Sequence, residues 1–159
     1  MIPDINVSLL LRLPRGAGPL PTIVKTHAAI IEKVGSVWFG VRGRIKEERY
    51  LHIWKQLSDS QPTFIFLVQL EKGQTTLFRG VVTEISDHVP SGEQAMVPPY
   101  YSENEILKFM RFWMKVSAFS KLNVTQFNRL KLSSSGLPVA RIIGRNMCST
   151  MWVDSPSTI

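Results

Sequence analysis

The sequence predicts an α+β domain built on a mixed or antiparallel, curled β-barrel with short flanking helices. Six or seven stretches have the composition or alternation of strands, and three or four have the spacing of short helices. These stretches do not alternate as β-α-β units, which argues against a doubly wound parallel sheet. The chain has 159 residues, 44% of them hydrophobic and 19% charged, as expected for one globular domain. We assign residues 1–153 to that domain and 154–159 to a tail or the start of a linker.

The first part of the chain is predicted to hold two strands and two helices. Proline and glycine make 14–21 a loop, and Gly35 suits the end of a helix that Thr22 or Thr26 begins. In the second helix, Tyr50, Ile53, Trp54 and Leu57 share a face, so Trp54 is expected in the core. The predicted elements are strands 5–13 and 37–41 and helices from 22 or 26 to 33 and from 46 to 57.

The rest of the chain is predicted to be richer in strands. A hairpin joins the strands 63–70 and 75–86, and a long loop with three prolines follows at 87–101. Ser102 with Glu105 has the spacing of a capping box, and Asn123 can cap a helix over 124–130. The remaining predicted strands are 112–122, 138–143 and 147–153.

The net charge of +7 is concentrated in one third of the chain. Residues 106–153 contain no acidic side chain, whereas the other residues hold 11 basic and 12 acidic ones. A patch of one sign attracts polyanions, and nucleic acid is the commonest large polyanion in a cell. A solvated face, an anionic membrane or an acidic partner remains an alternative explanation of the charge. The basic residues of this third are Lys108, Arg111, Lys115, Lys121, Arg129, Lys131, Arg141 and Arg145.

The chain offers no arrangement typical of an enzyme. His27, His52 and His88 lack the spacing of metal ligands, and Cys148 has no neighbouring base. Neither a dinucleotide-binding nor a P-loop glycine pattern is present. We therefore expect no catalytic residue, metal or cofactor, so any nuclease or NTPase activity would lie in another segment or a partner. The short apolar runs and the single cysteine predict a cytoplasmic protein without membrane contact.

Aromatic residues beside cations provide the candidate binding site. Trp38 and Phe39 precede Gly40 on a short strand, and Tyr100 and Tyr101 end the proline-rich loop. The alternation of its strand turns Trp113 away from the main core, next to Lys115. Such pairs suit an unstacked base, which exchanges its stacking partners for protein rings. Core packing of Trp38 and Phe39 is the competing interpretation.

Two motifs resemble a known superfamily. Thr26-His27, Ile30-Ile31 and Gly35, followed by Val37-Trp38-Phe39-Gly40, resemble a helix with a histidine, a glycine and a Trp-aromatic-Gly strand. The run 111–116 (RFWMKV) resembles a second strand motif. Together they resemble the PUA-like superfamily, specifically the EVE-like and YTH-like DNA-sensing domains of McrBC-type modification-dependent restriction systems. The likeness covers about Thr22 to Lys121, and Phe39 stands where a second tryptophan is often found.

The resemblance implies a non-catalytic sensor that reads a flipped, modified base in DNA for a restriction or antiviral defence system. The implied base pocket consists of Trp38, Phe39, Gly40, Tyr100, Tyr101 and Trp113. The expected phosphate-binding residues are Arg42, Arg44, Arg111, Lys115, Lys121, Arg141 and Arg145. In such systems an AAA+ motor and a nuclease follow in the same chain or in a partner.

The residues leave other functions open. The domain could be an RNA reader of the same superfamily, a basic module that binds an acidic protein or a membrane surface, or an enzyme of unfamiliar design. Nucleic-acid binding requires the aromatic residues to share a concave site with basic residues, so their relative positions discriminate between these functions.

Overall fold

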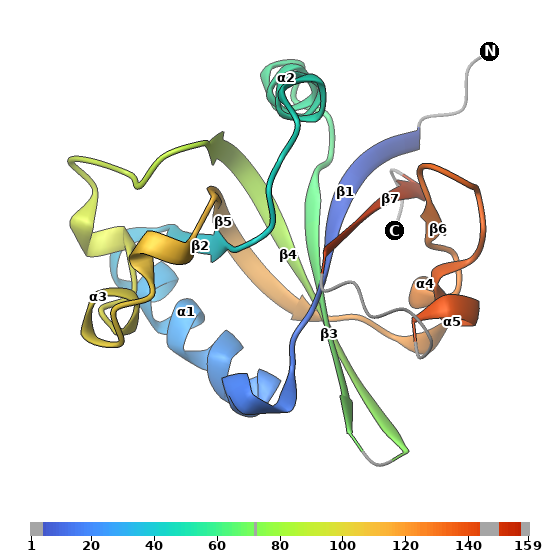
Figure 1. Cartoon of the computed structure of the whole chain (residues 1–159), viewed down its shortest axis with the longest axis horizontal. Helices are drawn as coiled ribbons and strands as arrows, with labels where there is room; N and C mark the ends of the chain where they lie inside the picture. Colours follow the sequence, from blue (N-terminus) through green and yellow to red (C-terminus); the bar gives the residue numbers. More distant parts are fainter. Residues whose placement is uncertain (1–4, 72, 144–149, 157–159) are drawn as a thin grey trace.

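Seven strands form one mixed sheet in the order β2-β5-β4-β3-β1-β7-β6 (Figure 1). The computed structural model describes residues 5–71, 73–143 and 150–156. Neighbouring strands are antiparallel except β1 and β3, which are parallel. The strands are β1 Ile5–Arg12, β2 Val37–Val41, β3 Phe64–Glu71, β4 Gln74–Ser86, β5 Phe112–Lys121, β6 Lys131–Leu132 and β7 Thr150–Pro156.

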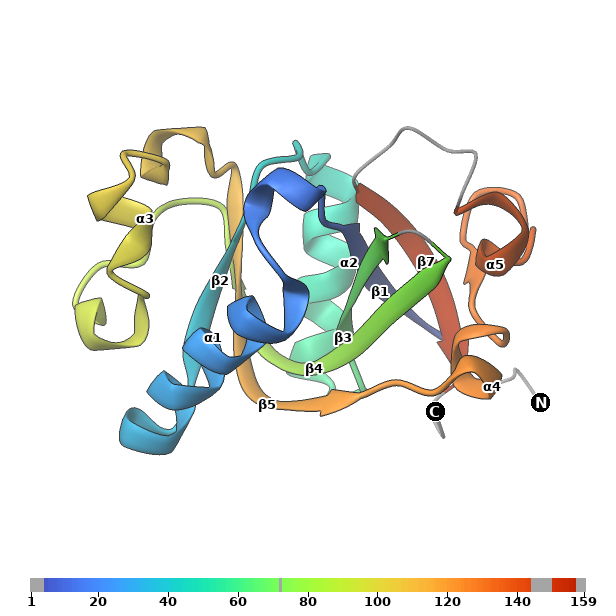
Figure 2. The same cartoon turned by 90° about the horizontal axis from the view of Figure 1, so that it is seen from below.

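The helices pack at different places around this sheet. The helix α1 and the helix α2 both pack on one core cluster that also contains Phe39 and Phe112. The short helices α4 and α5 lie at the other end of the molecule from α3 (Figure 2). The helices are α1 Leu20–Val34, α2 Glu47–Ser58, α3 Tyr100–Glu103, α4 Val124–Phe127 and α5 Val139–Ile142, with 3-10 turns η1 Arg15–Ala17, η2 Gln94–Met96 and η3 Leu107–Phe109.

The α+β class is confirmed, but the sheet is not closed into a barrel. It curls where the β4–β5 register shifts near Val82, because a bulge increases the local twist. β2 and β6 remain its two edges. At the β2 edge, the Gly40 N–H donates a 2.9 Å hydrogen bond to the Tyr101 hydroxyl of α3. A side chain therefore satisfies a backbone donor that barrel closure would have paired with another strand.

Several predicted elements agree with the structure to within a residue or two. The predicted hairpin appears as β3 and β4, and the strand predicted at 37–41 is β2. Asn123 and Gln126 form a capping box at α4. Gly35 ends α1 with a φ of 90°, the left-handed conformation that favours glycine. α1 begins at Leu20, before either predicted cap, because Pro21 fits the first turn of a helix.

Three local predictions are wrong. Residues 139–142 form the helix α5 where a strand was expected, because Pro138 precedes a helical turn there. The helix α3 begins at Tyr100, without the predicted Ser102 cap. Trp54 is 55% exposed, whereas Gln56 is buried. The Gln56 amide bonds both the N–H and the carbonyl of Val7, so a polar side chain takes the inward position.

Candidate functional site

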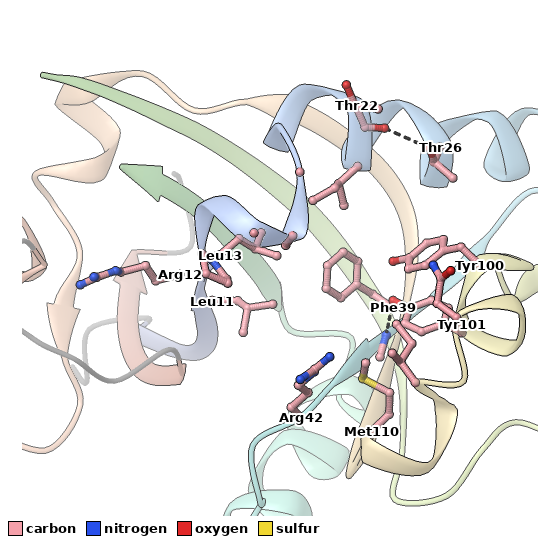
Figure 3. Close-up of a pocket in the computed structure, with 18 of the residues that line it drawn as sticks. Leu11, Arg12, Leu13, Thr22, Thr26, Phe39, Arg42, Tyr100, Tyr101 and Met110 are labelled. Carbon is pink, nitrogen blue, oxygen red and sulfur yellow. Dashed lines mark hydrogen bonds between the residues drawn. The ribbon is translucent and has the colours of Figure 1, made fainter. Parts of the chain in front are cut away.

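A cavity of about 810 Å³ opens between β1, α1, β2 and α3 (Figure 3). Its aromatic wall is made by Phe39 from β2 and by Tyr100 and Tyr101 from α3. The loop between β1 and α1 and the first turns of α1 form another side, where Thr22 and Thr26 are exposed. This volume lies in the range of small-molecule binding pockets, about 300–1,000 Å³.

His27 lies behind the aromatic wall and links its members. The imidazole stacks on Phe39 with ring centroids 4.6 Å apart. Its Nδ1 lies 2.8 Å from the Ile23 carbonyl oxygen, so that nitrogen donates and carries the proton. Nε2 is left as an acceptor, 3.4 Å from the Tyr101 hydroxyl and 3.5 Å from the Tyr100 hydroxyl. Burial lowers the pKa of His27 to about 4, so the ring is neutral at pH 7.

The two tyrosines are packed as a unit. Their rings stack with centroids 4.4 Å apart, and Tyr101 packs edge-on against Trp113. Tyr101 is buried, whereas Tyr100 is partly exposed and borders the cavity. Burial raises the pKa of both hydroxyls above the ordinary value for tyrosine, most strongly for Tyr101. Both therefore present neutral hydroxyl groups at pH 7.

Gly40 allows the layers beside the cavity to approach closely. A Cβ at this position would lie 2.9 Å from Cγ of Met110 and 3.0 Å from Cζ3 of Trp113. Any side chain would push Met110 and the buried indole away. The glycine therefore permits close packing and does not by itself mark a ligand approaching the backbone.

Trp38 and Trp113 lie behind the cavity lining. They are 2% and 0% exposed and form a cluster with Tyr101 that is separate from the main core. The alternation of β5 does turn Trp113 to that separate face, as the sequence predicts. Neither indole lines the cavity, so the arrangement differs from a pocket walled by these two residues. The predicted residues that do line it are Phe39, Gly40, Tyr100, Tyr101 and Arg42.

The predicted phosphate-binding residues divide into different environments. Arg42, Arg44 and Arg111 are exposed near the end of the sheet that carries α3. Lys121 and Arg141 are exposed near α4 and α5, and the ten residues of β5 put roughly 30 Å between its two ends. The charges that adjoin in sequence therefore do not form one patch in space. Arg145 lies outside the described residues.

Lys115 is paired with acidic groups of the protein itself. Its Nζ lies 3.2 Å from Glu93 and 3.5 Å from Glu84, and 5.6 Å from the centre of the Trp38 ring. Its side chain is 16% exposed. Two carboxylates therefore balance the positive charge of Lys115, which is expected from the sequence to contact phosphates.

Arg12 connects the cavity with α5. Its guanidinium donates a 2.8 Å hydrogen bond to the carbonyl of Ile143, just after that helix, while Arg12 also lines the cavity. Figure 3 shows the Arg12 side chain directed away from the aromatic wall, whereas the Arg42 guanidinium is directed toward the cavity.

Sequence reasoning missed His27 and the loop before α1 as parts of the site. Leu20, Val24 and His27 are the buried residues of α1 and recur at helical spacing, which was a signal that the imidazole faces inward. The loop 14–19 was recognisable as a loop but carries no aromatic or charged pattern pointing to a ligand. No group of three or more potential metal-ligating side chains occurs among the described residues. In the same part of the chain, no helix is long and apolar enough to span a bilayer.

Comparison with known proteins assigns the chain to a family. The model of the family described as Pua-like matches residues 9–142. That match covers most of the chain, so the protein belongs to the Pua-like family. No curated protein and no solved structure matches it. The family suggests a nucleic-acid-binding domain, which agrees with an aromatic cavity bordered by Arg42.

Proposed function

We propose that this protein is a non-catalytic reader of DNA that accepts one flipped, modified base in the cavity between α1, β2 and α3. The observation that carries the proposal is the shared position of Phe39, Tyr100, Tyr101 and Arg42 around one cavity. Aromatic rings replace the stacking partners that an extruded base loses, and the Arg42 guanidinium at the rim suits its phosphates.

The free-energy cost of flipping a base and the gain from binding it at such a site are of similar size. Flipping costs a few kcal/mol, and stacking on protein rings returns about 1–3 kcal/mol per base. Phosphate contacts supply further affinity without sequence information. A buried methyl group adds about 0.8 kcal/mol, roughly a fourfold preference, so strong selection of a modified base also requires the cavity to disfavour the unmodified one.

The polar lining offers a means of selecting the base. His27 is neutral and has an acceptor nitrogen near both tyrosine hydroxyls. Tyr100 is the partly exposed member of this group, so its hydroxyl is available to a polar edge of the base. Reading a polar edge gives larger discrimination than burying a methyl group, because a wrong base leaves buried groups unpaired.

We further propose that the domain serves as the sensor of a restriction or defence system, in which a motor and a nuclease are separate. This setting rests on the motif likeness around Trp38 and Trp113 to EVE-like and YTH-like sensors. The protein alone should then bind without cutting or modifying the nucleic acid.

A binding panel tests the proposal. Fluorescently labelled single- and double-stranded DNA and RNA, with and without methylated bases, are titrated with the protein while product formation is monitored with and without divalent metal. We expect the tightest binding to DNA with a modified base, and no product. A preference for RNA would support an RNA reader instead, and equal weak binding to all polyanions would contradict base reading.

A further inference from the structure

An exposed aromatic ring stands outside the cavity at its mouth. Phe109 ends the turn η3 and is 49% exposed. The guanidinium carbon of Arg42 lies 5.7 Å from the ring centre, and Nζ of Lys108 lies 5.3 Å from it. A half-exposed phenyl ring with two cations close to it has no evident structural role, since apolar burial stabilises a fold only when the ring leaves water.

The neighbours of Phe109 place it beside the cavity. Ile106 and Met110, on either side of it in the chain, both line the cavity. Arg42 belongs to both places, because it lines the cavity and lies over the Phe109 ring. A nucleic acid with one base in the cavity would therefore bring an adjacent nucleotide to this ring.

The charges around Phe109 are not balanced by acidic side chains of the described residues. Within residues 5–71, 73–143 and 150–156, neither Arg42 nor Lys108 forms a salt bridge, in contrast to Lys115. An aromatic ring beside cations that have no acidic partner matches the alternation of base and phosphate along a strand. Cations without an acidic partner make a purely apolar protein surface a poor match, and acidic side chains, which would satisfy the charges, offer no ring face to Phe109.

We propose that Phe109 stacks on the base next to the one held in the cavity, while Arg42 and Lys108 exchange their contacts with the ring for contacts with the flanking phosphates. This inference rests on the proposed function of the cavity and adds a second base-contacting site. The platform reads no sequence of its own, because every base has a face on which an aromatic ring can stack.

The variant Phe109→Ala tests the platform, with Trp54→Ala as matched control. Trp54 is also an exposed aromatic residue, but it lies on α2 and does not line the cavity. Using the tightest-binding oligonucleotide of the panel, we expect Phe109→Ala to weaken affinity at least about fivefold. Trp54→Ala should bind like the wild type, and both variants should retain the wild-type melting temperature. Equal affinities of Phe109→Ala and wild type would overturn the inference.

An abasic neighbour makes the test specific. Of two oligonucleotides that lack the base on the 5′ or on the 3′ side of the target, the one that lacks the stacked base should bind the wild type more weakly, by the factor that Phe109→Ala loses. One of these two oligonucleotides should bind Phe109→Ala no more weakly than the intact one does, since the platform is already gone. Additive losses for both oligonucleotides would contradict stacking on a neighbour.

A separate variant tests whether the cavity itself binds a base. Thr26→Trp places a bulky side chain at the exposed cavity wall, away from Phe109. If this variant loses binding while Phe109→Ala does not, the platform is wrong and the cavity stands. If Thr26→Trp binds normally, the proposed function itself is at fault.

Discussion

The indole Nε1–H of Trp38 donates a 2.6 Å hydrogen bond to the carboxylate of Glu93. Glu93 belongs to the loop that leads into α3, and Lys115 holds the same carboxylate from β5. The bond from Trp38, and next that from Lys115, keeps the pKa of Glu93 below its ordinary value. The loop is thus fastened to the sheet a few residues before Tyr100 and Tyr101, which places these rings in the cavity wall.

Removal of this contact should loosen the loop. We expect Glu93→Ala to lower the free energy of unfolding by about 1 kcal/mol, since the carboxylate is partly exposed, and to weaken oligonucleotide binding. The Trp38 indole should also become more accessible to acrylamide quenching in a Trp54→Phe background, which removes an exposed indole. Glu93→Gln is the control, because its amide oxygen can still accept from Trp38. Identical quenching of both variants would show that this bond does not hold the loop.

His27 should make stability depend on pH. Its pKa is about 4 in the folded protein, against an ordinary value of 6.5 for a solvated histidine, so between these values the unfolded chain binds more protons. Stability is therefore complete above pH 6.5 and falls as pH falls toward 4, by up to about 3 kcal/mol. Urea unfolding across this range measures the slope. His27→Gln should flatten it, and a variant with the wild-type slope would assign the titration to other groups.

The buried indoles of Trp38 and Trp113 should stabilise the fold. Trp38→Ala and Trp113→Ala should each lower the free energy of unfolding by about 3–5 kcal/mol, because both side chains are enclosed. Replacement of the exposed Trp54 by alanine should lower the free energy of unfolding by no more than about 0.5 kcal/mol. Thermal melts beside binding titrations separate the roles. A Trp38→Ala protein that keeps its melting temperature but loses binding would make Trp38 a ligand contact.

Much of the fold follows from the sequence because local signals and packing agree. The alternation in 112–122 and the hairpin residues around Gly73 predict β5 and the β3–β4 pair, and Asn123 begins α4 as expected. One failure arises because a distant residue decides which side chain faces inward. Gln56 turns inward because Val7, 49 positions away, offers both of its backbone groups. Trp54 is consequently left in solvent.

The site was predictable in composition but not in arrangement. Phe39, Tyr100 and Tyr101 do share one cavity, as the motifs and the loop suggest. The sequence cannot show that Glu93 would cover Trp38, nor that His27 would join the two tyrosines, because these contacts span 55 and 74 positions. The charge of Lys115 was similarly misread, since Glu84 and Glu93 approach it only in the folded sheet.

Removing a cation that forms a salt bridge and removing one that forms none should change the salt dependence of binding by different amounts. Each phosphate contact on duplex DNA contributes about −0.9 to the slope of log K against log salt. Arg42→Gln should therefore make the slope shallower by about 1 and weaken binding to all sequences. Lys115→Gln should leave the slope unchanged, because Glu84 and Glu93 already balance that charge. Equal changes in slope for both variants would show that the pairing opens on binding.

The central claim is that the cavity between α1, β2 and α3 takes the base, and filling it is the most direct test. Thr26 and Thr125 are both exposed threonines on helices, but only Thr26 lines the cavity. The affinity of Thr26→Trp for the tightest-binding oligonucleotide should fall at least about tenfold, a loss within the range of the stacking energy of one base. Its melting temperature should be unchanged. Thr125→Trp should bind like the wild type. Wild-type affinity in a well-folded Thr26→Trp protein would contradict a base in this cavity.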